Sequence, residues 1–391
     1  MRIKSAHLHR HSQQKDCEFM EKLKVLVVDD SVLYRKILSD ILSGFSEVEV
    51  VGAAPTGKLA LSKIRLNPPD FVTLDFEMPD MNGIETLKEL KKIAPETKAV
   101  MVSAHTQAGA QVTMQALEEG AFDFIAKPSS NNLAENKRIL AQQLKPIINI
   151  MLIKKRLNGL AVKPSALKPR PVPERIPSSS SVATRMSAIS GKGRSIIQHA
   201  GKVDIVALGI STGGPSALTH VLPRLPANFK VPIVIVQHMP PVFTGALADS
   251  LNKKSSITVV EAQDGMLLES ATAYIAPGGK MMKIEDAGGG NTVIIITDAP
   301  PENNCKPAAD YLFRSVAQCY RKNSLGVIMT GMGSDGTKGL LVMKKLGAKV
   351  IAQDEQSCTV FGMPMEAIKA GVVDIVAPLD NIADEIMASV K

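Results

Sequence analysis

The stretch "VDIVALGISTGGPSAL", from Val203 to Leu218, decides the fold of the second half of this 391-residue chain. Its apolar run lacks polar alternation and is rich in β-branched residues, which predicts a strand buried on both faces of a sheet. The small residues after the run predict a tight turn that leads into a helix. Ser211 lies in this turn, where it could be a nucleophile, part of a phosphate-binding loop or a helix cap.

Short apolar runs alternate with amphipathic helical patterns along both halves of the chain. The first half contains "KVLVV", "VEVVGAA", "FVTL", "AVMVS" and "DFIA", and the second contains "DIVALGI", "VPIVIVQH", "TAYIAP", "TVIII", "LGVIMTG" and "AKVIAQ". This order predicts parallel sheets covered by helices. We therefore expect two doubly wound, mainly parallel α/β domains. The first should have a five-stranded sheet and the second should be a larger, Rossmann-like domain. Functional groups should lie at the carboxyl ends of the strands.

A basic segment separates the two halves. The residues from Leu157 to Lys192 are rich in Pro and Ser and follow neither a helical nor a strand period, which predicts a flexible linker. Residues 147–200 hold ten Lys and Arg against one acidic residue, so they account for the whole net charge of +8. The predicted division is a disordered extension (1–20), a first domain (21–150), the linker (151–200) and a second domain (201–391).

Composition and charge argue against several classes of protein. The basic residues concentrate in one segment, aromatic residues make up 4% and Trp is absent, so we expect no nucleic-acid partner. No apolar run approaches about 18 residues and the N-terminus lacks an apolar signal-peptide core, so we expect a cytoplasmic protein that is not inserted in a membrane. The cysteines follow no metal-ligand spacing and are expected to be ordinary reduced thiols: Cys17, Cys305, Cys319 and Cys358.

Acidic residues end two strands of the first half. Asp29 and Asp30 follow "KVLVV" and Asp75 ends "FVTL", so three carboxylates should converge at one edge of the sheet. Like charges that close resist ionising together unless a cation joins them, and an oxygen-rich cluster suits Mg²⁺. The alternative is that Asp29 and Asp30 only cap the next helix. Ser103 and Lys127 at the ends of the fourth and fifth strands argue against that alternative.

This half, including "LDFEMPDMNG" (Leu74–Gly83), resembles the receiver domain of two-component response regulators over about 120 residues. The resemblance implies that Asp75 accepts a phosphoryl group from a histidine kinase. A phosphoryl group adds nearly two negative charges, which can reorder nearby loops. The other implied roles are Mg²⁺ binding by Asp29, Asp30, Asp75 and the Glu77 carbonyl, switching by the Ser103 hydroxyl, and contact of Lys127 with the phosphoryl oxygens.

Ser211 belongs to a GxSxG pattern on a strand-to-helix turn, as in a nucleophile elbow. No Gly-Lys-Ser/Thr follows, which argues against a phosphate cradle. A serine nucleophile needs a base. Among the histidines of this half, His199 precedes the first strand and His220 lies in a helix, whereas His238 ends the next strand. Asp335 follows a further strand and would orient that base. Capping by Ser211 alone would predict neither His238 nor Asp335.

The motifs "STGGPSAL", "VQHMPPVFTGALADSLN", "AYIAPGG", "LFRSVA" and "MTGMGSDG" together resemble the catalytic domain of protein-glutamate methylesterases of bacterial chemotaxis. The resemblance implies demethylation of methyl-accepting chemotaxis receptors, with glutamine deamidation, by a Ser/His/Asp esterase under receiver control. It implies no cofactor for the esterase step, Mg²⁺ only in the receiver, and a monomer. The implied residues are Ser211 as nucleophile, His238 as base, Asp335 as its orienter, and Thr212, Gly213 and Met332 as oxyanion and active-site support.

One segment departs from this family. "DAPPENNCKPAAD" carries Asn303, Asn304, Cys305 and Lys306 where the family is commonly richer in Arg and His, and we expect the departure to affect substrate docking but not the chemistry. Other classes remain open at this point. A DNA-binding response regulator lacks support because no helix-turn-helix pattern follows the linker. A non-catalytic scaffold would not need all three of Ser211, His238 and Asp335, and a small-ester hydrolase would lack an obvious lid.

Overall fold

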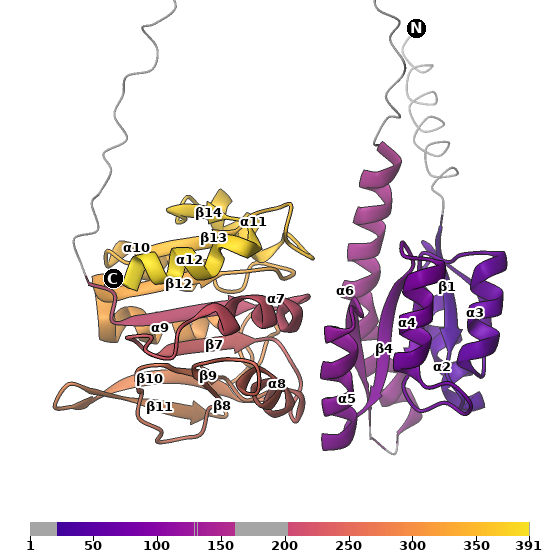
Figure 1. Ribbon diagram of the computed structural model, residues 1–391, viewed down its shortest axis with the longest axis horizontal. Helices are drawn as coiled ribbons and strands as arrows, with labels where there is room; N and C mark the ends of the chain where they lie inside the picture. The colour runs from indigo at the N-terminus through magenta and orange to yellow at the C-terminus, as the bar shows by residue number, and fades with distance from the viewer. Residues whose placement is uncertain (1–21, 129, 131, 161–201, 391) are drawn as a thin grey trace, which may run out of the picture.

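The computed structural model describes residues 22–128, 130, 132–160 and 202–390. The predicted N-terminal extension and most of the predicted linker lie outside these residues. The described residues form two α/β bodies (Figure 1). Both predicted α/β domains are therefore present, and the predicted fold class is confirmed.

The first body is a five-stranded parallel sheet in the order β2-β1-β3-β4-β5. Its strands are β1 (Leu23–Val28), β2 (Val48–Ala54), β3 (Phe71–Asp75), β4 (Lys98–Ala104) and β5 (Asp123–Lys127). The helices that connect and cover them are α2 (Val32–Ser43), α3 (Gly57–Leu66), α4 (Gly83–Ile93), α5 (Gln107–Glu118) and α6 (Leu133–Leu160). Strands β1, β3 and β4 are almost wholly buried, as their unbroken apolar runs predict.

Helix α6 extends ten residues past the expected start of the linker at residue 151. Leu144, Ile148 and Met151 of this helix are buried against the sheet, and Lys155 Nζ donates to the Lys22 carbonyl (2.9 Å) and bonds Asp70 (2.9 Å). These contacts hold the helix on the domain beyond the point where its sequence becomes basic. No helix in the described ranges is long and apolar enough to cross a membrane.

The second body is a seven-stranded parallel sheet in the order β14-β13-β12-β6-β7-β9-β8. Its strands are β6 (Ile205–Ile210), β7 (Ile233–Gln237), β8 (Thr258–Glu261), β9 (Thr272–Ile275), β12 (Ser324–Ile328), β13 (Lys349–Gln353) and β14 (Ile375–Ala377). Its helices are α7 (Gly214–Val221), η1 (Leu222–Arg224), α8 (Phe243–Asn252), α9 (Ala309–Tyr320), η2 (Arg321–Asn323), α10 (Thr337–Lys345), α11 (Met363–Lys369) and α12 (Leu379–Val390).

The run "TVIII" does not join this parallel sheet. It forms β11 (Asn291–Thr297), which pairs antiparallel with β10 (Met281–Gly288) as a separate hairpin. Gly288, Gly289 and Gly290 all have positive φ, which permits the tight reversal between these strands. An apolar run alone does not tell a strand of a parallel sheet from one of a hairpin.

The central strand β6 has β12 on one side and β7 on the other, so the strand order reverses there. Connections leave the sheet in opposite directions from such a point and leave a crevice at the carboxyl ends of the strands. The turn that carries Ser211 follows β6 directly. The topology therefore puts Ser211 at the position where α/β proteins most often build their sites.

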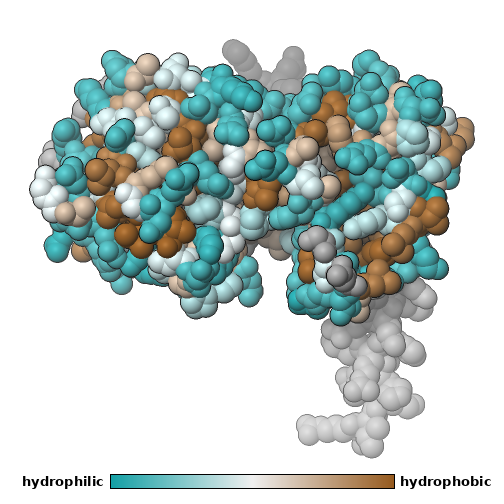
Figure 2. Space-filling view, turned by 90° about the horizontal axis from the view of Figure 1, so that it is seen from below, coloured by the Kyte–Doolittle hydropathy of each residue, from teal (hydrophilic) through white to brown (hydrophobic). Residues whose placement is uncertain are grey.

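The two bodies contact each other through β5 and α5 of the first and α7 and α8 of the second (Figure 1). The rings of Phe124 and Phe243 stack with centroids 4.6 Å apart. The ring of His105 also contacts Phe243, with centroids 5.8 Å apart. Glu118 accepts a hydrogen bond from Ser250 (2.5 Å) and pairs with Lys254 (2.5 Å). On the face of the molecule shown in Figure 2, both bodies carry hydrophilic residues with apolar residues scattered among them.

Candidate active site

Ser211 is held at the carboxyl end of β6 by its own backbone. Its N–H donates to the Thr330 carbonyl (2.9 Å), and its carbonyl accepts from Gly214 N–H (2.7 Å). Gly213 has a φ of 78°, and a Cβ there would lie 2.4 Å from the side chain of Thr359. The turn therefore needs glycine at this position, for its conformation and for the space. The predicted strand-to-helix turn is confirmed.

Gln237, whose role the sequence does not reveal, fixes the two turns to each other. It ends β7, is buried, and its Nε2 donates to the carbonyls of Ser211 (3.0 Å) and His238 (3.3 Å). A Cβ on Gly214 would lie 1.9 Å from Gln237 Oε1, so α7 can start over Gln237 only because residue 214 is glycine. The only sequence signal for this role is that Gln237 is a polar residue at the end of an apolar strand.

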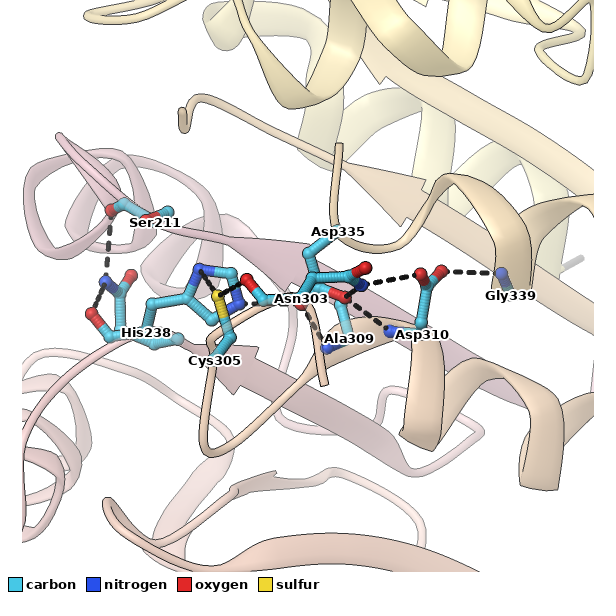
Figure 3. Close-up of polar contacts among 9 residues, drawn as sticks. Ser211, His238, Asn303, Cys305, Ala309, Asp310, Asp335 and Gly339 are labelled. Atoms are coloured by element: carbon cyan, nitrogen blue, oxygen red, sulfur yellow. Dashed lines mark hydrogen bonds and ion pairs between the residues drawn. The ribbon is translucent and has the colours of Figure 1, made fainter. Parts of the chain in front are cut away.

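His238 and Asp335 meet as predicted, at the ends of β7 and β12. His238 Nε2 lies 2.8 Å from Asp335 Oδ2, and Asp335 is 2% exposed. Asp335 also accepts hydrogen bonds from the N–H groups of Ala309 (2.6 Å) and Asp310 (3.1 Å), the first residues of α9. Helix α9 has no capping side chain of its own, so Asp335 caps it from another loop. Four hydrogen bonds, counting one from Asn303, fix this carboxylate (Figure 3).

The environment shifts the pKa values of this pair in opposite directions. Burial lowers the pKa of His238, but its hydrogen bonds with Asp335 and Cys305 outweigh burial and raise the pKa to about 9. Burial raises the pKa of Asp335, yet the bond to His238 and the N–H groups of α9 hold that pKa below its usual value. The arrangement favours a carboxylate that supports an imidazolium, as a proton-accepting histidine requires.

The segment "DAPPENNCKPAAD" lies against this pair, so the expectation that it affects docking and not the chemistry stays a prediction. Asn303 Nδ2 donates to Asp335 (2.9 Å) and to Asp310 (2.9 Å), and Cys305 Sγ lies 3.7 Å from His238 Nδ1. These contacts follow from the position of α9. Because Asp335 caps the start of α9, the residues just before α9 must pass over His238. Figure 3 shows the His238 ring between Cys305 and Asp335.

Asp310, also not singled out from the sequence, completes this network. It is buried, and its carboxylate accepts from Gly339 N–H (2.6 Å) as well as from Asn303. Burial raises its pKa above the usual range. No hydrogen bond joins Ser211 Oγ to His238 in the part of the chain that the structure describes. The ring nitrogen of His238 that faces away from Asp335 is instead next to Cys305.

Two of the three predicted oxyanion and support residues directly follow Ser211 in the turn before α7. Thr212 and Gly213 are the last two residues before α7, so their N–H groups lie at the positive end of that helix. The Thr212 carbonyl accepts from Thr330 Oγ1 (2.9 Å). Met332 lies in the β12–α10 loop and is 39% exposed. The Thr212 side chain is close enough to Asp123 of β5 to oppose the rise in the pKa of that carboxyl, so the first body lies near the residue next to Ser211.

The predicted acidic cluster is present in the first body. Asp29, Asp30 and Asp75 offer carboxylate oxygens within 4.8 Å of one another. Lys127 Nζ lies 3.0 Å from Asp29 Oδ2 and 2.8 Å from Asp75 Oδ2. Burial raises the pKa of Asp75 to about 6, with a further contribution from Asp29 and in spite of Lys127. A cluster whose carboxylates resist joint ionisation is chemically suited to a small hard cation.

The other predicted receiver residues lie around this cluster. Ser103, the residue before the last of β4, is buried, and its hydroxyl donates to the Gly109 carbonyl of α5 (3.0 Å). Glu77 is an exposed residue in the loop directly after β3. A Cβ on Gly83 would lie 2.4 Å from the Asp75 carbonyl, so α4 can begin this close to Asp75 only with glycine there. Ser103 is thus bonded to α5, the helix that contacts the second body.

The fold and these clusters define a two-domain hydrolase whose second domain follows a receiver domain. Residues 25–137 match the family described as "Response regulator receiver domain", and residues 206–386 match "CheB methylesterase". The chain belongs to the family of protein-glutamate methylesterases/protein-glutamine glutaminases, and the resemblance predicted from its motifs is confirmed.

Relatives named "Protein-glutamate methylesterase/protein-glutamine glutaminase" match this chain over nearly its whole length, and three of them illustrate the similarity. The one from Desulfotalea psychrophila is 52% identical over 95% of this chain and 100% of its own length. The one from Trichodesmium erythraeum is 40% identical over 94% of this chain and 99% of its own. The one from Bacillus subtilis is 42% identical over 94% of this chain and 99% of its own. Both domains and their order are therefore shared with these enzymes.

Proposed function

We propose that this enzyme hydrolyses γ-methyl glutamyl esters, and deamidates glutamine side chains, on methyl-accepting chemotaxis receptors, and that phosphorylation of Asp75 activates it. The observation that carries the chemistry is the 2.8 Å contact of His238 with a buried, fourfold hydrogen-bonded Asp335, beside a serine on a strand-to-helix turn. The names of the relatives support the substrate. Cytoplasmic location and a monomeric state belong to the same proposal.

In the proposed reaction, Ser211 Oγ attacks the ester carbonyl while His238 Nδ1 accepts its proton. Asp335 stabilises the imidazolium that forms. The N–H groups of Thr212 and Gly213 and the backbone near Met332 stabilise the oxyanion, each donor contributing about 3 kcal/mol. Methanol leaves with the proton from His238. Water then attacks the acyl-enzyme, His238 takes its proton, and the products are a receptor carboxylate and free Ser211. A glutamine substrate releases ammonia by the same steps.

One rearrangement is needed for the first step. Nδ1 is the ring nitrogen that Asp335 leaves available, and in the structure it faces Cys305 Sγ. Ser211 Oγ or the segment with Cys305 must therefore shift before Ser211 can give up its proton. Catalytic hydrogen bonds often tighten only when substrate binds. This step needs no cofactor, because the serine, the imidazole and water supply every proton and bond.

The acidic cluster supports the proposed regulation. Asp75 would accept a phosphoryl group from a chemotaxis histidine kinase, and Asp29, Asp30, Asp75 and the Glu77 carbonyl would hold Mg²⁺. Mg²⁺ when bound would neutralise charge on the transferred phosphoryl group. Lys127, which already pairs with Asp75, would bind the added oxygens. Ser103 would exchange its bond to the Gly109 carbonyl for one to the phosphoryl group, and α5 would shift as a result.

The contact between the domains supports occlusion as the resting state. Helix α5 and strand β5 lie against α7 and α8, and Asp123 contacts Thr212, the neighbour of the nucleophile. A receiver this close to Ser211 would obstruct the approach of a receptor helix bundle to that turn. Phosphorylation would shift a two-state docking equilibrium toward the open arrangement. Residues 202–391 alone should then be faster than the unphosphorylated full-length enzyme.

The experiment is methanol release from receptor-bearing membranes with labelled methyl esters, together with ammonia release from the same receptors. Wild type is compared with Ser211→Ala and with Ser216→Ala, a serine of α7 outside the proposed machinery. We expect both products to disappear in Ser211→Ala and to persist in Ser216→Ala. Release that survives in Ser211→Ala would remove the nucleophile from the proposal.

A further inference from the structure

Cys305 has no part in the proposed chemistry, yet it is in contact with the proposed base. Its Sγ lies 3.7 Å from His238 Nδ1 with hydrogen-bond geometry, and 3.6 Å from the Asn303 carbonyl. The ligand atoms of His238, Cys305 and Asp335 all lie within 4.8 Å of one another. We propose that Cys305 and His238 bind a thiophilic divalent cation, of which Zn²⁺ fits best, and that the bound ion inhibits the esterase.

The spacing of the two donor atoms fits zinc. Zinc lies about 2.3 Å from a thiolate sulfur and about 2.0–2.1 Å from an imidazole nitrogen, so tetrahedral geometry sets these ligands about 3.6 Å apart. The observed 3.7 Å differs from this by only about 0.1 Å. An ion could therefore enter between Sγ and Nδ1 with little movement of the side chains. The thiol proton would be released to water on binding.

The orientation of the ring is also that of a zinc ligand. Histidines that bind zinc usually donate their second ring N–H to a carboxylate, which fixes the ring and its tautomer. Asp335 accepts from His238 Nε2 in this way, and is itself fixed by the N–H groups that begin α9. A thiolate and an imidazole select zinc-like ions over Mg²⁺, which prefers oxygen ligands. The acidic cluster around Asp75 offers oxygen ligands and suits Mg²⁺, so the two sites differ in the cation that they select.

The site is open to solvent and incompletely coordinated by protein. The His238 side chain is 14% exposed, and Cys305 is half-buried. Two protein ligands leave positions for water, so binding should be reversible. A bound ion would occupy Nδ1, the nitrogen that Ser211 needs, and would therefore stop the first proton transfer. The inhibitory effect rests on the proposed function, whereas binding itself does not.

Binding is tested with Co²⁺ as a spectroscopic substitute for Zn²⁺ on the full-length protein. A thiolate ligand gives a sulfur-to-cobalt charge-transfer absorption that oxygen ligands do not give. We expect this absorption in wild type, in Cys319→Ser and in Cys17→Ser, and its loss in Cys305→Ser and Cys305→Ala. Cys319 is the matched control because it is a half-buried cysteine in α9 that bonds the Ile284 carbonyl instead of a histidine. No absorption in wild type, or unchanged absorption without Cys305, would overturn the proposal.

Inhibition is tested by methanol release with added Zn²⁺ and no phosphodonor, each variant relative to its own zinc-free rate. At ten times the dissociation constant, the rate should fall about elevenfold in wild type and in Cys319→Ser. The same Zn²⁺ concentration should change the rate of Cys305→Ser by less than about twofold. Equal inhibition with and without Cys305 would refute an inhibitory site here. Activity that persists in Ser211→Ala, with the cobalt absorption intact, would instead refute the proposed nucleophile and leave the metal site standing.

Discussion

Asp123 of β5 offers a way to strengthen the contact between the two domains, because its carboxyl lies beside Thr212 of the second domain. Burial raises the pKa of Asp123 from 3.8 to about 6, although the Phe124 N–H and the Thr212 side chain favour its ionised form. At neutral pH this carboxylate is therefore ionised in a place that disfavours charge. This rise in pKa means that the ionised carboxylate of Asp123 disfavours docking of the two domains by about 3 kcal/mol. This is an upper limit, since part of the burial comes from the receiver domain itself.

We predict that Asp123→Asn stabilises the docked state and lowers the unphosphorylated rate, by at most about 150-fold. The amide has the shape of the carboxylate and can still accept from Thr212, but carries no charge. The measurement is methanol release at pH 7.5 with and without a small phosphodonor and Mg²⁺. The fully phosphorylated rate should approach that of wild type, so the ratio of activated to basal rate should rise. Glu96→Gln, an exposed carboxylate of the receiver, is the control and should change neither rate.

The sign of the pH dependence tests the same reasoning. Because the pKa of Asp123 is raised in the docked state, docking is most favourable below pH 3.8, weakens as the pH rises toward 6 and is constant above that. In Asp123→Asn this dependence should be absent, as measured by small-angle scattering of the unphosphorylated protein between pH 4 and 7. A basal rate equal to or above that of wild type in Asp123→Asn would refute the claim that this contact inhibits the enzyme.

Four further predictions follow from the two sites. Asp335→Asn should lower kcat by about 10³–10⁴-fold with little change in KM, as measured by methanol release, because the amide stabilises the wrong imidazole tautomer. Because hydrogen bonds raise the pKa of His238 to about 9 against the effect of burial, kcat/KM should increase with pH up to about 9, and Cys305→Ala should move this increase to lower pH. Lys127→Ala should abolish activation by phosphodonor and leave the unphosphorylated rate within about twofold of wild type, since Lys127 contacts Asp29, Asp75 and the ring of Tyr34, all within the receiver. Gly213→Ala should lower both the melting temperature and activity, by about 1–3 kcal/mol in stability, because its φ is 78° and its Cβ would meet Thr359; a melting curve equal to wild type would contradict this.

The sequence was sufficient for those site residues that stand at strand ends. Ser211, His238 and Asp335 each follow a different buried strand, and parallel strands bring their carboxyl ends to one edge. The same rule located Asp29 and Asp75. Such residues are predictable because an apolar run marks each strand and the parallel topology brings the ends of the strands together.

The contacts that the sequence did not reveal depend on how loops fold back on the site. Asn303 and Cys305 reach Asp335 and His238 only because Asp335 caps α9, a contact between loops about 25 residues apart in the chain. The role of Gln237 depends on the close approach of Gly214. The contact of Asp123 with Thr212 depends on how two domains dock. Periodicity carries no information on any of these contacts.

The central claim is that one chain couples phosphorylation of Asp75 to hydrolysis at Ser211. The most direct test is the rate of methanol release from labelled receptor membranes by wild type and Asp75→Asn, each with and without phosphodonor and Mg²⁺. We predict that phosphodonor accelerates wild type, leaves Asp75→Asn at its basal rate, and has no effect on residues 202–391 alone, which should already be fast. Equal acceleration of Asp75→Asn, or a catalytic domain no faster than the unphosphorylated full-length enzyme, would contradict the account.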